Sequence, residues 1–169
     1  MGEIDMRDYS MCNRVKAVFV SGVILALPVH AKADSPKFDQ VTCMRHAAEI
    51  VEQTGAQFDR LSPSGANIFL RHPSLKTLTL NCERSLFNLA AVKSIPDRDF
   101  YDVLDRVGSI MFGARPGQAR ALAQRCHKMA LANNDLLMGE VVGSLLSVDC
   151  NVVLRGEGGF FVGMSARQN

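Results

Sequence analysis

The chain has 169 residues, of which 47% are hydrophobic and 21% are charged, and its formal net charge is +2. This length suits one domain, and the composition is that of an ordinary globular protein. The small net charge argues against a nucleic-acid-binding protein, and the absence of Trp with only two Tyr leaves few aromatic side chains on which single-stranded nucleic acid could stack.

The first predicted element is residues 17–29, AVFVSGVILALPV, a run without a charged side chain. As a helix it would be roughly 20 Å long, which is short of the ~30 Å hydrocarbon core of a bilayer. A buried core helix and an amphipathic membrane anchor are the alternatives. The length fits the apolar region of a secretory signal peptide best.

The residues on either side of the apolar run support a signal peptide. Arg14 and Lys16 form a basic flank before it, and Ala31 and Ala33 after it are the small residues that a signal peptidase reads. We therefore predict cleavage between Ala33 and Asp34.

This cleavage divides the chain into a signal peptide, residues 1–33, and a single globular domain, residues 34–169. The residues before Met11 include several acidic side chains, which are unusual at the start of a signal peptide, so a true start at Met11 is an alternative. No run after Ala33 is long and apolar enough to span a membrane. The sequence therefore predicts a periplasmic or secreted protein with no stable membrane span.

A helix is predicted over residues 36–54, ending at Gly55. Cys43 lies on one flank of its apolar stripe. The stripe itself consists of Val41, Met44, Ala48 and Val51.

Strands separated by turns are predicted over residues 56–82, because SPSG at 62–65 and HPS at 72–74 are typical turn sequences. One candidate strand is ANIFLR, at 66–71. In the next, LKTLTLNC, Cys82 shares a face with two leucines.

The pattern over residues 83–95 fits either a short helix or a loop. A clear helix follows over 97–112, ending at Gly113, and another is predicted from Pro116 to about Ala132. The apolar face of the first consists of Phe100, Val103, Leu104, Val107 and Met111, and that of the second of Ala119, Leu122, Ala123, Cys126, Met129 and Ala130.

The C-terminal third returns to β structure. LLMGEVV, at 136–142, is a candidate strand, and LLSVDCNVVLR, at 145–155, alternates so that Cys150 faces inward. GEGG at 156–159 predicts a hairpin turn before a last strand, FFVGMSA. The order helix, strands, two helices, strands predicts an α+β fold, an antiparallel sheet with about three helices packed on one face.

Four cysteines remain in the predicted mature chain: Cys43, Cys82, Cys126 and Cys150. An even number in an exported chain, each on or beside a core-facing stripe, predicts two structural disulfides. Sequence alone allows three pairings. Cys43–Cys82 with Cys126–Cys150 is slightly favoured, because each bond would join a helix to a following strand, and the main competitor is Cys43–Cys126 with Cys82–Cys150.

No metal or other cofactor is predicted. Cys43 with His46, and Cys126 with His127, could be assembled into a zinc site, but in each helix the cysteine faces inward and the histidine lies toward the polar side. Oxidised cysteines also cannot bind a metal.

No ordered catalytic motif is present either, and the chain lacks a G-x-S-x-G elbow. His72 before Pro73 is interpreted as a turn residue, and His46 and His127 as solvated helix residues. The densest carboxylate cluster, Asp97, Asp99, Asp102 and Asp105, follows the polar face of a helix and is interpreted as solvated.

These observations favour a non-catalytic, disulfide-stabilised envelope protein that binds a protein partner, and they give no sign of a nucleic-acid partner. One version is an inhibitor or immunity-type protein with a blocking loop at 62–65 or 156–159. The alternatives are a small exported hydrolase that uses His72 or His127, and a subunit of an envelope assembly.

Overall fold

The computed structural model describes residues 39–133, 137–156 and 158–167. The predicted signal peptide and its cleavage site lie outside the described residues and stay predictions.

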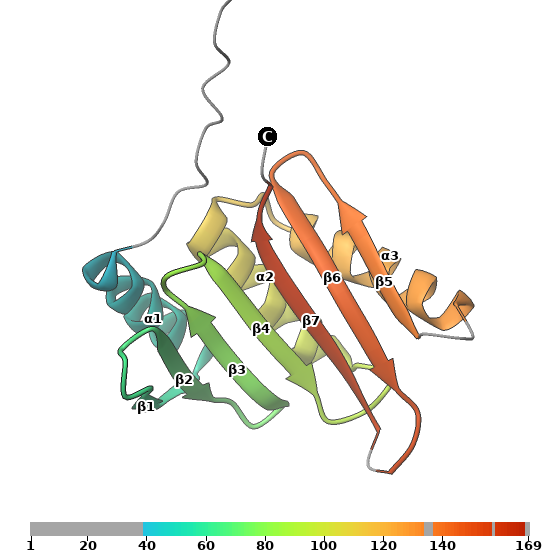
Figure 1. The fold of residues 1–169 in the computed structure, drawn as a ribbon, viewed down its shortest axis with the longest axis horizontal. Coiled ribbons are helices and arrows are strands. Elements are labelled where there is room, and N and C mark those ends of the chain that lie inside the picture. The colour runs from blue at the N-terminus through green and yellow to red at the C-terminus, as the bar shows by residue number, and fades with distance from the viewer. Residues whose placement is uncertain (1–38, 134–136, 157, 168–169) are drawn as a thin grey trace, which may run out of the picture. The chain divides into compact units, whose positions relative to one another are not determined.

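The described residues form three helices and seven strands, and the strands make one antiparallel sheet in the order β1-β2-β3-β4-β7-β6-β5 (Figure 1). The helices cover one face of this sheet, which confirms the predicted α+β class. The elements are α1 Gln40–Thr54, β1 Gln57–Leu61, β2 Asn67–Arg71, β3 Leu75–Asn81, β4 Leu86–Ala91, α2 Arg98–Phe112, α3 Gln118–Ala132, β5 Met138–Val142, β6 Leu146–Val153 and β7 Gly159–Ala166.

Two meanders build the sheet. The first runs through β1 to β4, the second through β5 to β7, and α2 and α3 connect them. The pairing of β4 with β7 joins the meanders, in a register that runs from Leu86 opposite Ser165 to Ala91 opposite Phe160. Both connecting helices lie on the same face of the sheet that the two meanders form (Figure 1).

Alternation along the strands places the core between the sheet and the helices. In β6, for example, the side chains of Leu146, Val148, Cys150 and Val152 are buried under the helices, while those between them point to the other face. The predicted apolar face of α2 is also confirmed, from Phe100 to Met111.

The predicted stripe of α1 is wrong. Its buried residues are Cys43, His46, Ala47 and Ile50, whereas Val41 is 80% exposed and Met44 is 38% exposed. The apolar pattern did not reveal the buried face of α1, because His46 occupies one of the buried positions where an apolar residue is expected.

Three further expectations are corrected. Residues 83–95 contain strand β4 rather than a helix or a structureless loop. The helix predicted from Pro116 begins instead at Gln118. Gly117 precedes it with a φ of 80°, a left-handed conformation that cannot be part of a right-handed helix. In α3 the buried face includes His127, while Met129 is exposed.

Two disulfides tie helices to the sheet. Cys43 of α1 bonds to Cys82 at the end of β3, and Cys126 of α3 bonds to Cys150 of β6, with Cα–Cα distances of 5.6 and 6.0 Å. This is the pairing that the sequence slightly favoured, and the distances are ordinary for disulfides.

We predict that replacing both Cys126 and Cys150 by Ala lowers the free energy of unfolding by about 3–4 kcal/mol, because opening a loop of 24 residues restores chain entropy to the unfolded state. Urea unfolding of the variant and the parent measures this. Reduction of the parent should add about 4 Da to its intact mass, one hydrogen for each sulfur atom. Equal stability of variant and parent would contradict the structural role of this bond.

Candidate interaction surface

His72, a candidate catalytic residue of the hydrolase alternative, lines a hollow, but its ring forms hydrogen bonds with the backbone. The hollow has a volume of ≈ 360 Å³, and Ser74, Asp99 and Asp102 also line it. The Nε2 atom of His72 lies 3.2 Å from the Thr54 carbonyl oxygen, and Nδ1 accepts the Ser74 N–H at 3.2 Å. Both nitrogens therefore fix the turn between β2 and β3 against the end of α1, and no serine or aspartate side chain of the described residues is hydrogen-bonded to the ring.

His127 also has a structural position. Its Nε2 atom lies 2.9 Å from the Ser94 carbonyl oxygen, and its ring packs 4.4 Å from that of Phe160. The interpretation of His127 as a solvated residue was wrong, because α3 turns it toward the segment that follows β4. Burial lowers the pKa of His127 below its usual value, and the bond to Ser94 partly opposes this.

His46 is buried on the core face of α1, so the interpretation of it as solvated was also wrong. Burial lowers the pKa of His46, and the neighbouring Arg45 acts in the same direction. Among the described residues, no group of three or more His, Cys, Asp or Glu side chains is placed to hold a metal ion. The cysteines beside both helical histidines are in disulfides.

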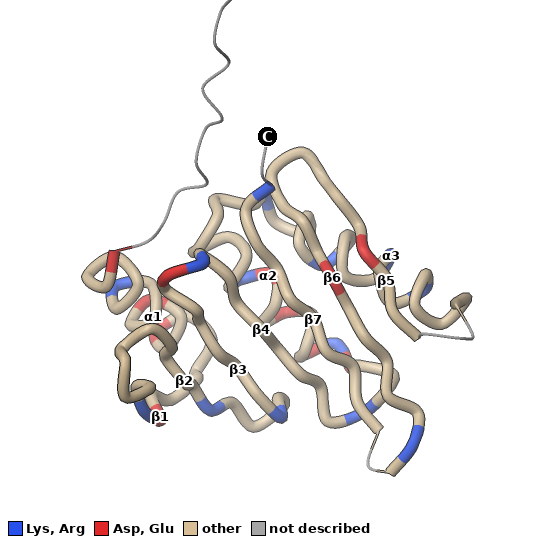
Figure 2. The backbone as a smooth tube through the Cα atoms, viewed as in Figure 1, with Lys and Arg blue, Asp and Glu red and all other residues tan. Residues whose placement is uncertain are grey.

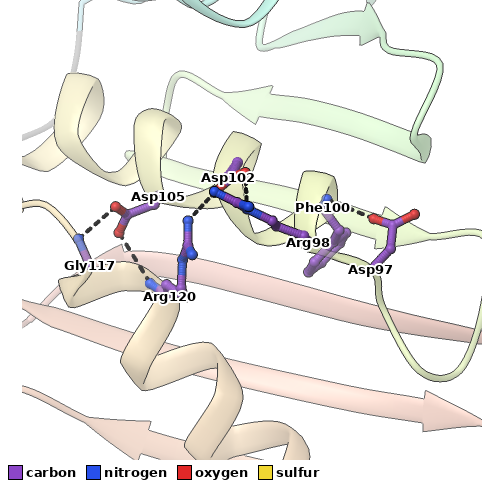
Figure 3. Close-up of polar contacts among 7 residues, drawn as sticks. All are labelled: Asp97, Arg98, Phe100, Asp102, Asp105, Gly117 and Arg120. Carbon is purple, nitrogen blue, oxygen red and sulfur yellow. Dashed lines mark hydrogen bonds and ion pairs between the residues drawn. The ribbon is translucent and has the colours of Figure 1, made fainter.

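The carboxylate cluster of α2 holds two helices together (Figure 3). Asp97 caps α2 by accepting the Phe100 N–H at 3.0 Å, and Asp102 forms ion pairs with Arg98 on its own helix and with Arg120 on α3. A wholly solvated face was therefore an incomplete interpretation. Asp99 remains exposed.

Asp105 supplies a cap that α3 cannot supply for itself. Gly117 stands at the N-cap of α3 and has no side chain to accept a hydrogen bond. The Asp105 carboxylate accepts the Gly117 N–H at 2.6 Å and the Arg120 N–H at 3.3 Å (Figure 3). A carboxylate at this position also suits the positive end of the helix dipole.

The face of the sheet that none of the described helices covers is called here the open face. Its central cross-strand row is read from the register of all seven strands. In order from β1 to β5 this row is Arg60, Phe69, Thr79, Asn88, Gly163, Asp149 and Glu140. The acidic segments within β5 and β6 in Figure 2 belong to Glu140 and Asp149.

A hollow of ≈ 260 Å³ lies on the open face beside this row. Gly163 forms part of its floor, and a Cβ atom there would lie 2.4 Å from an Asp149 carboxylate oxygen. Phe161 borders the hollow and stays 38% exposed, with its ring extending over Gly159. Phe161 and Met138, which are both exposed, thus add apolar surface to a hollow whose other lining residues include Thr77, Asn88 and Asp149.

The two loops considered for blocking a partner lie at opposite ends of the sheet. Residues 62–65 follow β1, and the turn after β6 precedes β7; β1 and β6 run in opposite directions in this antiparallel sheet. Residue 157 of the second loop lies outside the described residues. The two loops therefore do not form one surface.

No family model matches the chain, and no curated protein or solved structure matches it. In the part of the chain that the structure describes, no helix is long and apolar enough to cross a membrane.

We predict that Asp105→Ala lowers the free energy of unfolding by about 1–2 kcal/mol, because two backbone N–H groups at the start of α3 lose their acceptor. Asp99→Ala is the matched control from the same helix and should change stability by less than about 0.5 kcal/mol, as exposed substitutions do. Chemical denaturation of the three proteins measures the difference. Equal effects of the two substitutions would show that Asp105 is not a cap.

The buried histidines predict a loss of stability in acid. Because the pKa values of His46 and His127 are lower in the folded domain than the ordinary value of 6.5, the unfolded chain binds more protons as the pH falls through that value. Their contribution is therefore present above the unfolded pKa and is lost below it.

We expect the urea concentration at the unfolding midpoint to decrease as the pH is lowered from about 7.5 to about 5.5. The decrease should be smaller in His127→Gln. Glutamine retains an N–H donor for the Ser94 carbonyl oxygen but does not titrate in this range. An identical decrease in both proteins would exclude His127 as a contributor.

Proposed function

We propose that this chain is an exported, non-catalytic protein whose domain binds a protein partner in the cell envelope. The observation that carries the proposal is the one-sided architecture, in which the described helices cover one face of the sheet and the open face exposes the apolar side chains of Met138, Val142 and Phe161. A group of exposed apolar side chains on one face of a domain is typical of an interaction surface.

Export is supported by two independent features. The apolar run with its basic flank and Ala-Lys-Ala end is typical of a signal peptide, and the disulfides are typical of proteins that fold in an oxidising compartment. Residues 31–34 carry the proposed cleavage site. The mass of protein recovered from the periplasm should match that of the chain from Asp34 onward.

The hydrolase alternative has less support. The rings of His72 and His127 form hydrogen bonds with backbone groups, and the ring of His127 packs against Phe160, so none of these contacts is a nucleophile–base pair. A subunit of an envelope assembly would use the same open face and differs from the main proposal only in the permanence of the complex.

We predict that the tagged domain captures a protein from envelope extract and that Phe161→Glu loses most of this capture. The substitution places a charge at the aromatic side chain of the open face, where desolvating it on binding would be costly. Gln124→Glu is the matched control, because residue 124 is exposed on α3, away from the open face.

Thermal unfolding of both variants checks that they are folded. Equal capture by the parent and by both variants would contradict a role of the open face, and no capture above background by any of them would contradict the proposed function.

A further inference from the structure

The outer edge of β5 presents unpaired backbone groups. The Val152 N–H donates to the Leu137 carbonyl oxygen at 2.8 Å, and the Gly143 N–H donates to the Leu146 carbonyl oxygen at 2.8 Å. In an antiparallel pair the hydrogen-bonded residues alternate, so residues 139 and 141 also face β6. The N–H and C=O groups of Met138, Glu140 and Val142 therefore point outward, and no described strand pairs with them.

Packing on α3 holds this edge in place. A Cβ atom on Gly139 would lie 2.8 Å from the Cys126 carbonyl oxygen, so the glycine permits close packing of β5 on α3. Val141 is buried on the same side. The Cys126–Cys150 disulfide joins α3 to β6, the only strand paired with β5 among those described. A strand that binds here meets a preorganised edge, which lowers the entropic cost of binding.

The opposite edge of the sheet is protected. The register of β1 shifts between Phe58 and Arg60, and Asp59 at this irregularity forms ion pairs with Arg60 and Arg71. A bulge and charged side chains are the common means of preventing strand addition. The register of β5 against β6 runs without a shift from Met138 to Val142, and β5 contains neither Lys nor Pro.

The side chains of β5 indicate what kind of strand fits. Met138 and Val142 are 53% and 54% exposed, and they flank Glu140 on the open face. Glu140 lies directly opposite Asp149 of β6, and among the described residues neither carboxylate has an ion-pair partner. Like charges at opposed positions are destabilising, so a cationic side chain beside Glu140 would be favoured.

The same charges disfavour a second copy of this chain. Antiparallel pairing of two β5 strands centred on Glu140 would place four carboxylates in one cross-strand row, two from each copy. A foreign strand with a central Lys or Arg and flanking apolar residues avoids this repulsion.

We propose that the outer edge of β5 binds an extended segment of the partner protein as an eighth strand, with a Lys or Arg side chain beside Glu140. This inference rests on the proposed function, and it identifies the chemistry of the partner. Backbone hydrogen bonds to residues 138, 140 and 142 supply affinity, and the side chain opposite Glu140 supplies selectivity.

The test uses two synthetic probes, the peptide Thr-Val-Thr-Lys-Thr-Val-Thr and the same peptide with Glu in place of Lys. Binding to the oxidised domain is followed by amide chemical shifts of residues 138–142. The Lys peptide should bind about fivefold more tightly than the Glu peptide, and Glu140→Lys should reverse this preference. Glu140→Pro should abolish the binding of both peptides, since it removes an outward N–H that no described strand uses.

Failure of the inference and failure of the proposed function have different signatures. Undiminished capture of an envelope protein by Glu140→Pro would overturn the edge proposal and leave the proposed function intact. The edge proposal is also overturned if neither peptide shifts the β5 signals at concentrations on the order of 1 mM, or if the preference is unchanged in Glu140→Lys. A parent dimer that Glu140→Pro converts to monomer would assign the edge to a second copy and so overturn it too.

Discussion

The pairing of β4 with β7 is the contact on which the rest of the domain depends. It joins two meanders that are separated along the chain by α2 and α3, and it does so through six opposed residue pairs without a shift in register. Because side chains alternate along both strands, this register aligns the apolar side chains of the two meanders under one layer of helices. A slip by one residue would turn the buried side chains of Phe160, Val162 and Met164 toward the open face.

The one-sided helix layer gives the two faces of the sheet different roles. On the covered face, disulfides at Cys43 and Cys126, and the Asp105 cap between α2 and α3, hold the helices in place. On the open face, Phe161 and Met138 border the same hollow, and both side chains remain exposed. The β1 edge is closed by a bulge and ion pairs, so β5 is the edge that the described strands leave available.

Local periodicity predicted much of this fold. The apolar residues of α2 recur at helical spacing, and the alternation in β3 and β6 placed Cys82 and Cys150 on the inner face. Strand β4 was missed because Phe87, Leu89, Ala90 and Ala91 are all buried, so its sequence does not alternate clearly between polar and apolar. Its conformation depends on pairing with β3 and with the distant β7, which no local pattern records.

The interaction surface was less accessible to sequence reasoning than the fold. The loops at 62–65 and 156–159 were chosen because their sequences are typical of turns. An edge strand is instead defined by the order of strands in the sheet. In that order the second meander joins β4 through β7, which leaves β5 at the edge. Gly139 was the available signal, since a glycine within an apolar strand often marks the close approach of another backbone. The unneutralised pair of Glu140 and Asp149 appears only once the register of β5 against β6 is known.

Amide hydrogen exchange of the free domain tests most directly whether the sheet is closed at β4–β7 and open at β5. The account predicts protected amides along β4 and β7, and alternation in β5, where residues 139 and 141 exchange slowly and residues 138, 140 and 142 exchange rapidly. Uniform protection of all five β5 amides in a monomeric sample would show that the outer edge is already covered and would contradict the account.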